Sequence, residues 1–339
     1  MSNKTHTVNE EKLANYLATQ IPGFKGPLTA TKFAGGQSNP TFHLKSGSGG
    51  YVLRRKPPGE LLKSAHAVDR EFRVISALAK SDVPVAEAYT LCEDESVIGS
   101  MFYVMQYIDG RVLWDPRIPE LDNTERAAIY DEMNRVLAAL HRVDVEAAGL
   151  GDFGKPGNYY ARQISRWSKQ YRAAETETIE AMDHLIDWLP ANLPADDGMV
   201  SLVHGDYRLD NMLFHRSEPK VLAVVDWELS TLGHPYADLA YQCAQWRLPA
   251  VPELKGLAGI DRTSLGIPEE EDYVTRYCVR QNISSIPDWN FYMVFCCFRF
   301  ASIIQGVKKR ALDGNASSEE AINMGAVVPL VAQTAVDLI

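Results

Sequence analysis

One short segment carries the carboxylate and the oxygen ligands that a metal-assisted transfer reaction would need. His204, Gly205 and Asp206 are followed by Asn211 and then, after an apolar run, by Asp226. Phosphoryl transfer requires one carboxylate beside the attacking hydroxyl and further oxygen ligands for the magnesium that neutralises the phosphates. Asp206 fits the first role, and Asn211 and Asp226 fit the second. Because Mg2+ usually keeps several waters, two protein ligands and the nucleotide phosphates are a sufficient set.

Short strands are expected on both sides of this segment. Leu202 and Val203 lead into it, residues 212–214 leave it, and the apolar run 221–225 ends at Asp226. Such runs, bounded by turn residues, are typical of buried strands. Asp and Asn are also common in ordinary turns, but a turn does not explain the order of the set. The segment is therefore predicted to be a loop held between strands.

On these residues the chain resembles the kinase-like phosphotransferase family, which includes aminoglycoside phosphotransferases, choline kinases and homoserine kinases. It shares the pattern H-G-D-x4-N at 204–211 and the later aspartate, Asp226. Further matching strings are GGQSNPT at 35–41, YVLRRKPPG at 51–59 and DWELSTLGHP at 226–235. In particular, the chain looks like the kinase-like domain that occurs alone in bacteria or joined to acyl-CoA dehydrogenases in animals.

The resemblance implies an α+β, bilobal fold of the protein-kinase type. Its N-terminal lobe, residues 1–107, would bind ATP and contain an antiparallel sheet with one main helix. Its C-terminal lobe, residues 108–339, would be mostly helical and hold the catalytic segment and the substrate. The implied cofactors are ATP and Mg2+. Asp206 would act on the hydroxyl, and Arg208 would lie near the transferred phosphate, where its charge could stabilise the transition state.

A glycine turn between two expected strands is the candidate phosphate loop. It comprises Gly35, Gly36, Gln37, Ser38 and Asn39. Glycines allow backbone amides to approach phosphates closely. Because a double glycine is also common in an ordinary hairpin, this assignment depends on the strand and helix that follow.

The following strand and helix supply a candidate ion pair. Residues 51–54 read as a strand that ends at Arg54, and a helical pattern containing Glu71 follows. The resemblance assigns Arg54 and Glu71 to the pair that orients the phosphates, with arginine in place of the usual lysine. Arg55 and Lys56 are alternative cations; strand alternation places Arg54 and Lys56 on one face and Arg55 on the other. An ordinary surface salt bridge is the alternative interpretation.

Residues 101–110 read as a strand that ends at a turn, where kinases have the hinge between their lobes. Gln106, Tyr107 and Ile108 are expected to hold adenine through backbone groups. A buried edge strand would show the same pattern.

A helix expected over 159–173 has aromatic and apolar residues on one side and Arg162, Arg166 and Lys169 on the other. This cationic face could bind the phosphates of coenzyme A, or it could be a solvated face. The acidic run 269–272 points the other way, because it could attract a polycationic aminoglycoside. Carboxylates also favour a helix N-terminus, which is the simpler interpretation of that run.

Two polar residues near the motif are interpreted as structural. His204 is expected to be a hydrogen-bonded structural residue rather than an acid or base. Asp238 matches a family aspartate that braces the catalytic loop.

Composition limits the classes of protein to which the chain can belong. Its 339 residues fit two lobes, and its 34 basic and 44 acidic residues give a net charge of -10, which argues against nucleic acid as a partner. The apolar stretch 291–298 is shorter than the roughly 20 residues that span a bilayer, so it is predicted to be a buried helix and no membrane partner is expected.

The five cysteines form no C-x-x-C pair, and the chain begins without a signal sequence. A cytoplasmic location is expected.

The sequence therefore predicts an ATP- and magnesium-dependent phosphotransferase that acts on a hydroxyl group of a small molecule. A hydroxyacyl-CoA or a related metabolite is the favoured acceptor, with an acyl-CoA dehydrogenase as a candidate functional partner. The alternatives are an aminoglycoside-type antibiotic kinase and a non-catalytic, nucleotide-binding pseudokinase, which Arg54 in place of lysine keeps open. Protein kinase activity is disfavoured, because Trp227 and Glu228 replace Phe-Gly and no Ala-Pro-Glu motif follows.

Overall fold

The chain forms two compact units. The computed structural model describes residues 7–33, 39–57, 67–314 and 323–339. Unit 1 consists of Met1–Arg111, Ala148–Leu150 and Asn211–Ser230, and unit 2 of Val112–Ala147, Gly151–Asp210 and Thr231–Ile339. The first segment of unit 1 thus ends close to the division predicted at residue 107, and two later segments join it.

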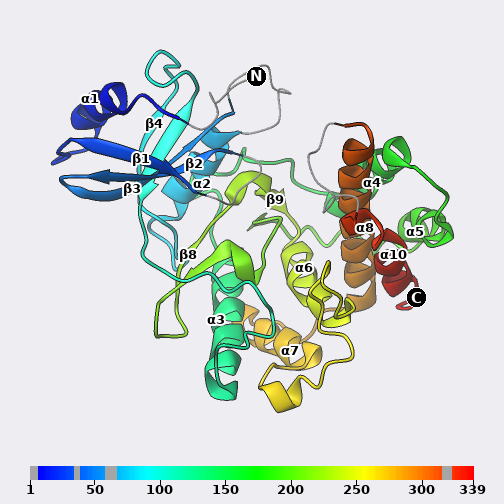
Figure 1. Cartoon of the computed structure of the whole chain (residues 1–339). Helices are drawn as coiled ribbons and strands as arrows, with labels where there is room; N and C mark the ends of the chain where they lie inside the picture. Colours follow the sequence, from blue (N-terminus) through cyan, green and yellow to red (C-terminus); the bar gives the residue numbers. More distant parts are fainter. Residues whose placement is uncertain (1–6, 34–38, 58–66, 315–322) are drawn as a thin grey trace. The chain divides into compact units, whose positions relative to one another are not determined.

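Unit 1 is built on a five-stranded antiparallel sheet with the strand order β1-β2-β3-β5-β4 (Figure 1). Its sheet and helices are α1 (Glu10–Gln20), β1 (Leu28–Lys32), β2 (Thr41–Ser46), β3 (Gly49–Arg55), α2 (Val68–Leu78), β4 (Ala88–Cys92) and β5 (Phe102–Gln106).

Alternation along the strands sends successive side chains to opposite faces of the sheet. Phe42 of β2 and Leu53 of β3 are fully buried in one core cluster with Leu17 of α1. Arg54, the next residue along β3, points to the opposite face, where it meets Glu71 of α2. The period of two therefore delivers a charged side chain to α2 while its neighbours build the core.

A hairpin from the middle of the chain completes unit 1. It consists of β7 (Met212–Phe214), β8 (Val221–Val224) and the 3-10 turn Trp227–Leu229. Met212 lies opposite Val224, and the Val224 amide donates a hydrogen bond of 2.9 Å to the Pro84 carbonyl. The strands predicted after Asn211 and before Asp226 are confirmed.

Unit 2 is mostly helical. Its elements are α3 (Asn123–His141), α4 (Tyr159–Ala174), α5 (Glu180–Ala191), β6 (Ser201–Val203), the 3-10 turn Leu209–Asn211 at the boundary of the units, β9 (Thr231–Gly233), α6 (Tyr236–Arg247), the 3-10 turn Thr263–Leu265, α7 (Glu270–Gln281), α8 (Trp289–Leu312) and α10 (Val328–Val336). The strands β6 and β9 pair antiparallel, with Val203 opposite Thr231. In Figure 1, α4 and α10 lie alongside α8.

Three sequence expectations for these helices are confirmed. Residues 291–298 are buried in α8. By length and composition this helix could cross a membrane, but 67% of its most apolar stretch is buried inside the protein, as in a core helix. In α4, Tyr160, Ile164 and Tyr171 are buried while the cations at 166 and 169 are exposed. The acidic run at 269–272 begins α7, so it is a helix N-terminus.

The predicted α+β class is confirmed. An antiparallel sheet with its helices occupies the N-terminal part of the chain, and helices dominate the remainder.

Candidate active site

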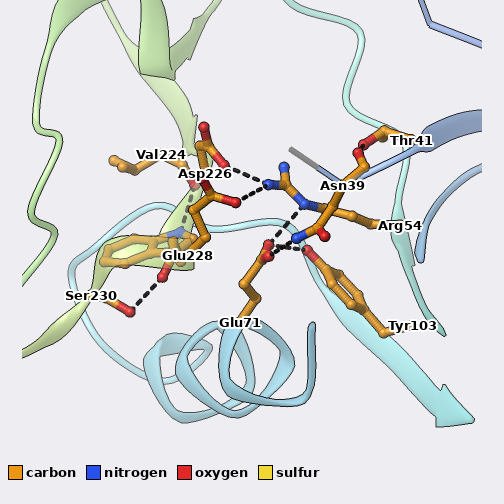
Figure 2. Close-up of polar contacts among 10 residues, drawn as sticks. Asn39, Thr41, Arg54, Glu71, Tyr103, Val224, Asp226, Glu228 and Ser230 are labelled. Atoms are coloured by element: carbon orange, nitrogen blue, oxygen red, sulfur yellow. Dashed lines mark hydrogen bonds and ion pairs between the residues drawn. The ribbon is translucent and has the colours of Figure 1, made fainter. Parts of the chain in front are cut away.

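A cluster of charged side chains surrounds Arg54 in unit 1 (Figure 2). The Arg54 guanidinium lies 3.0 Å from Glu71 Oε2, 2.5 Å from Asp226 Oδ1 and 3.5 Å from Glu228 Oε2. The ion pair predicted between Arg54 and Glu71 is confirmed. The participation of Asp226 and Glu228 was not predicted, because it depends on how the hairpin packs onto the sheet.

Two neutral side chains hold the Glu71 carboxylate in place. The Asn39 amide nitrogen donates to Oε1 at 2.8 Å, and the Tyr103 hydroxyl donates to Oε2 at 3.1 Å. Asn39 therefore binds the ion pair, whereas its predicted contact with phosphate stays a prediction. The other predicted members of the glycine turn lie outside the described residues: Gly35, Gly36, Gln37 and Ser38.

This cluster carries more negative than positive charge. Three carboxylates meet one guanidinium, which leaves an excess of two negative charges when all are ionised. Burial raises the pKa of Glu71 to about 7, Arg54 opposes this rise, and Asp226 and Glu228 add to it. Burial alone would lower the pKa of Arg54, but Glu71 and Asp226 raise it on balance. A further cation would therefore relieve repulsion among the carboxylates.

The two predicted metal ligands lie at the open end of the hairpin in unit 1. Asn211 directly precedes β7, and Asp226 follows β8. The Val225 amide donates to the Asn211 carbonyl at 3.0 Å, so the two ligands are held across the hairpin from each other. An amide oxygen and a carboxylate, with Glu228 close by, form the oxygen-donor set that Mg2+ prefers.

Protein ligands alone would not fill such a site. Over the described ranges, no group of three or more His, Cys, Asp or Glu residues is placed to hold a metal ion. Nucleotide phosphates and water would have to complete the coordination, and the magnesium site stays a prediction.

The backbone of Asp226 is in the left-handed region, with φ 69° and ψ 55°. This conformation is uncommon for a residue other than glycine, although Asp and Asn tolerate it best. Because such conformations persist mainly where surrounding structure imposes them, and often at functional sites, this geometry marks Asp226 independently of its sequence motif.

The alternative cations after Arg54 have other partners. Lys56 lies 3.8 Å from Asp69 of α2, on the same side as Arg54. Arg55 is buried on the opposite face, where it lies over the Phe42 ring at 5.5 Å. The predicted alternation of these three side chains is confirmed, and Arg54 is the cation that meets Glu71.

The residues predicted to hold adenine follow β5. The Gln106 amide donates to the Glu87 carbonyl at 2.8 Å, so this donor is used within the unit. The Tyr107 ring stacks on His43 with ring centroids 4.2 Å apart, and Ile108 comes next. No contact joins these residues to the Arg54 cluster among the described contacts, and the adenine site stays a prediction.

In unit 2, the loop that contains Asp206 follows β6 and is fixed by its backbone. The Asp238 carboxylate accepts from the His204 amide at 2.6 Å and from the Gly205 amide at 2.8 Å. The His204 ring nitrogen Nδ1 accepts from the Asp206 amide at 3.2 Å. The bracing role predicted for Asp238 and the structural role predicted for His204 are both confirmed.

His141 completes this brace, and no local sequence pattern pointed to it. Its Nε2 lies 3.5 Å from Asp238 Oδ2, and its Nδ1 lies 2.7 Å from the Tyr277 hydroxyl. Burial alone would raise the pKa of Asp238, but the hydrogen bond and charge of His141 and the Gly205 amide outweigh it, and the pKa is lowered. Asp238 is therefore held ionised.

The Asp206 carboxylate has a cation and a phenol as neighbours. Arg208 Nε lies 3.7 Å from Asp206 Oδ1, and its Nη2 lies 2.9 Å from Asp210. Burial, the charge of Asp206 and a hydrogen bond to it raise the pKa of Tyr241 well above its ordinary value. Tyr241 therefore stays protonated and donates to Asp206.

A buried arginine, Arg299 of α8, also fixes the loop and was missed in the sequence. Its Nη2 donates to the Gly205 carbonyl at 2.6 Å. Its guanidinium carbon lies 5.4 Å from the Tyr241 ring centroid and 5.7 Å from that of Trp167. Arg299 thus connects the backbone beside Asp206 to the side chain that binds Asp206.

The predicted catalytic residues Asp206 and Arg208 belong to unit 2. The remaining residues of the predicted phosphate and metal sites that are described belong to unit 1: Asn39, Arg54, Glu71, Asn211 and Asp226. The chain passes between the units after Asp210, so the catalytic loop of unit 2 runs directly into the metal-ligand hairpin of unit 1.

Comparison with known proteins agrees with this geometry. A family model described as "Phosphotransferase enzyme family" matches residues 29–264. Acyl-CoA dehydrogenase family member 10 of Mus musculus is 48% identical over 336 residues, which cover 98% of this chain and 31% of that protein. Member 11 of Homo sapiens is 42% identical over 338 residues, 98% of this chain and 43% of that protein. The chain spans less than half the length of these curated relatives.

Solved structures show the same fold. A protein from Ralstonia eutropha, provisionally assigned as an aminoglycoside phosphotransferase, has a TM-score of 0.91 and 51% identity, covering 98% of each chain. A ternary complex of aminoglycoside phosphotransferase APH(4)-Ia with AMP-PNP and hygromycin B has a TM-score of 0.62 and 16% identity, covering 96% of this chain and 98% of that one. The second likeness concerns the fold alone.

Proposed function

Because the chain belongs to the phosphotransferase enzyme family, we propose that it transfers the γ-phosphate of ATP, with magnesium, to a hydroxyl group of a small molecule. The observation that carries the proposal is the state of Asp206. Its loop is fixed by Asp238 and Arg299, and its carboxylate lies against Arg208 and Tyr241. A fixed carboxylate of this kind can orient an acceptor hydroxyl and receive its proton.

The roles of the remaining residues follow from their charges. Asn211 and Asp226 would hold magnesium, which supplies charge neutralisation on the phosphates when bound. Arg54 would contact the phosphates while Glu71 keeps its guanidinium oriented. Arg208 would place a positive charge beside the transferred group. Arg54 and Asp226 lie 2.5 Å apart. Binding of magnesium and ATP would replace this contact with one between Arg54 and phosphate and one between Asp226 and magnesium.

We favour a hydroxyacyl-CoA or a related metabolite as the acceptor. The curated relatives named above support this choice, because their names identify acyl-CoA dehydrogenases. The cations of α4 also support it: Arg166 and Lys169 are exposed on one face of this helix, and coenzyme A carries several phosphate charges. An acyl-CoA dehydrogenase is a candidate functional partner on the same grounds.

The test is phosphoryl transfer detected by product mass. Magnesium-ATP is supplied with hydroxyacyl-CoAs whose hydroxyl lies at successive carbons, free hydroxy acids, aminoglycosides, choline and homoserine. We expect a mass gain of one phosphate on a hydroxyacyl-CoA and its loss in Asp206→Asn, by a factor on the order of 100 to 10,000, with unchanged ATP affinity. ATP binding without transfer to any compound would favour the pseudokinase alternative, and transfer to an aminoglycoside alone would favour the antibiotic kinase.

A charge-reversal variant tests the coenzyme A contact separately. Arg166→Glu should raise KM for an acyl-CoA acceptor while leaving KM for ATP unchanged. The matched control is Lys80→Glu, an exposed cation of unit 1. If KM for the acyl-CoA acceptor were the same in Arg166→Glu as in Lys80→Glu, the cations of α4 would form only a solvated face.

A further inference from the structure

A small cavity in unit 2 adjoins the residues that contact Asp206. Its volume is ≈ 50 Å3. One face of α6 forms much of its wall, and residues from three other segments complete the lining without enclosing the cavity. The lining residues that matter here are Tyr241, Ala244, Gln245, Leu248, Leu254 and Phe300.

Two residues belong both to this cavity and to the surroundings of Asp206. Arg208 lines the cavity and places its Nε 3.7 Å from Asp206 Oδ1. Tyr241 also lines it and is hydrogen-bonded to Asp206. An acceptor whose hydroxyl reaches Asp206 would therefore place the adjoining part of its carbon skeleton at this cavity.

The chemistry of the walls selects the kind of group that fits. Ala244, Leu248, Leu254 and Phe300 offer apolar surface, and among the described lining residues the only charged group is the Arg208 guanidinium. None of these described residues is a carboxylate, so an ammonium group would be desolvated there without a partner from the lining. An uncharged aliphatic group would gain from burial instead.

Gln245 supplies the one uncharged amide of the wall. Its Oε1 is buried and has no hydrogen-bond partner among the described residues. A buried acceptor that lacks a hydrogen bond costs free energy. This oxygen therefore either accepts a hydrogen bond from a donor on the ligand or lowers the affinity for an apolar chain. Substitution of Gln245 distinguishes these two cases.

The size of the cavity limits the length of the chain. A volume of ≈ 50 Å3 leaves room for only a few water-sized groups, since one such group needs at least roughly 10–15 Å3. A methyl or methylene group is similar in size, so about three carbons are the most that the cavity would take.

We propose that this cavity binds a short, uncharged aliphatic chain of the acceptor, on the side of the hydroxyl-bearing carbon away from its activated carboxyl end. The inference rests on the proposed phosphotransferase function and names the acceptor class more closely. It assigns acceptor selection to α6 and its C-cap, through Ala244 and Leu248.

The experiment compares acceptors that differ only in this chain. At the hydroxyl position that is phosphorylated, hydroxyacyl-CoAs with one, three and seven carbons beyond the carbinol are compared by kcat/KM. The three-carbon compound should exceed the one-carbon compound by about tenfold, because each buried methylene contributes a few-fold. The seven-carbon compound should fall well below the three-carbon compound. Equal values for all three would overturn the proposal.

Two variants change the cavity in opposite senses. Ala244→Leu fills it and should remove the advantage of the three-carbon compound over the one-carbon compound. Leu248→Ala enlarges it and should move the preference toward the seven-carbon compound, which tests the proposal even if Ala244→Leu does not fold. Val279→Ala, on the exposed side of α7, is the control and should leave the chain-length profile unchanged.

Gln245→Leu decides whether the bound group is apolar. We expect the variant to retain or increase kcat/KM for the three-carbon compound. A loss of tenfold or more would show that Gln245 binds a polar group of the acceptor, which would overturn the aliphatic assignment.

Binding measurements separate this proposal from the proposed function. If no compound is phosphorylated, the phosphotransferase proposal fails, and titration calorimetry with the same compounds then decides the cavity. Affinity that peaks at the three-carbon compound and is flattened by Ala244→Leu would still support the cavity proposal. No binding, or binding that ignores chain length in both proteins, would overturn it. Transfer with no dependence on chain length would overturn the cavity proposal alone.

Discussion

Buried carboxylates occur in both units, and their partners differ. In unit 2, Asp238 accepts from two backbone amides and also contacts His141. In unit 1, Glu71 shares a single guanidinium with Asp226 and Glu228. The first carboxylate has its pKa lowered by its partners, whereas the pKa of the second is raised to about 7 despite an ion pair.

This difference separates a brace from a binding site. Donors that surround one carboxylate stabilise a fixed loop and leave no charge for a ligand. Carboxylates in excess over their cation repel one another until another cation arrives. Unit 2 thus uses a buried charge to fix Asp206, and unit 1 retains unbalanced charge where magnesium and phosphate are proposed to bind.

Removing the brace should have the largest effect. Asp238→Ala would leave the amides of His204 and Gly205 and the ring of His141 without their shared partner. We expect a loss of about 3–5 kcal/mol in the free energy of unfolding measured with urea, as when one partner of a buried charged pair is removed. Asp272→Ala, an exposed carboxylate, is the control. A loss as small as that of the control would mean that the loop is fixed without Asp238.

Removing charge from the unbalanced cluster should affect ligand binding more than folding. Asp226→Asn keeps a residue that tolerates the left-handed backbone and removes one negative charge. We expect the dissociation constant for ATP with magnesium to rise about 10–100-fold, while ATP without magnesium is little affected. Calorimetric titration with and without magnesium measures both.

Asp69→Asn is the control for this variant, since Asp69 also belongs to unit 1 and is 43% exposed beside Lys56. If Asp226→Asn lowered stability but left the magnesium dependence intact, the Arg54 cluster would be a brace like that of Asp238.

The pH dependence of stability should reveal the raised pKa of Glu71. Its pKa is about 7 in the folded protein and 4.5 in an ordinary environment, so the folded state binds the proton more tightly. The unfolding free energy should therefore fall as the pH rises from 5.5 to 7.5, by at most about 2 kcal/mol. Urea unfolding across this range measures the slope, and Glu71→Gln should flatten it. Identical slopes in the two proteins would contradict the assignment.

A smaller effect is expected at Arg299, which acts through the loop. Arg299→Lys keeps the positive charge but loses the planar group that lies over Tyr241 and Trp167. We expect kcat to fall about tenfold, as for one lost hydrogen bond to a charged group, with KM for ATP unchanged. Steady-state kinetics separates the two constants. A change in KM for ATP with constant kcat would show that Arg299 does not position Asp206.

The fold and much of the site could be predicted because local patterns determine them. The family resemblance implied the ion pair of Arg54 and Glu71, and the alternation around Arg54 and the helical spacing around Glu71 agree with it. The apolar runs beside Asn211 and Asp226 likewise predict the hairpin strands. These inferences needed only short segments of sequence and the family resemblance.

The residues that were missed depend on contacts between distant segments. Arg299 lies 94 residues from Gly205 and His141 lies 97 from Asp238, so no local spacing connects them. One signal was available for Arg299: it is the only charged residue of α8 before Lys308. A cation within an otherwise apolar helix is rarely buried without a partner.

The composition of unit 1 has a consequence for the order in which the protein can fold during synthesis. Its sheet is complete by Arg111, but its hairpin ends at Ser230, and more than half of the intervening residues belong to unit 2. The ribosome therefore releases a long part of unit 2 before unit 1 can close around Arg54. Domains generally fold as units as they emerge, so a nascent chain that ends before residue 226 would contain the sheet without Asp226, and Arg54 would acquire that partner only late in synthesis.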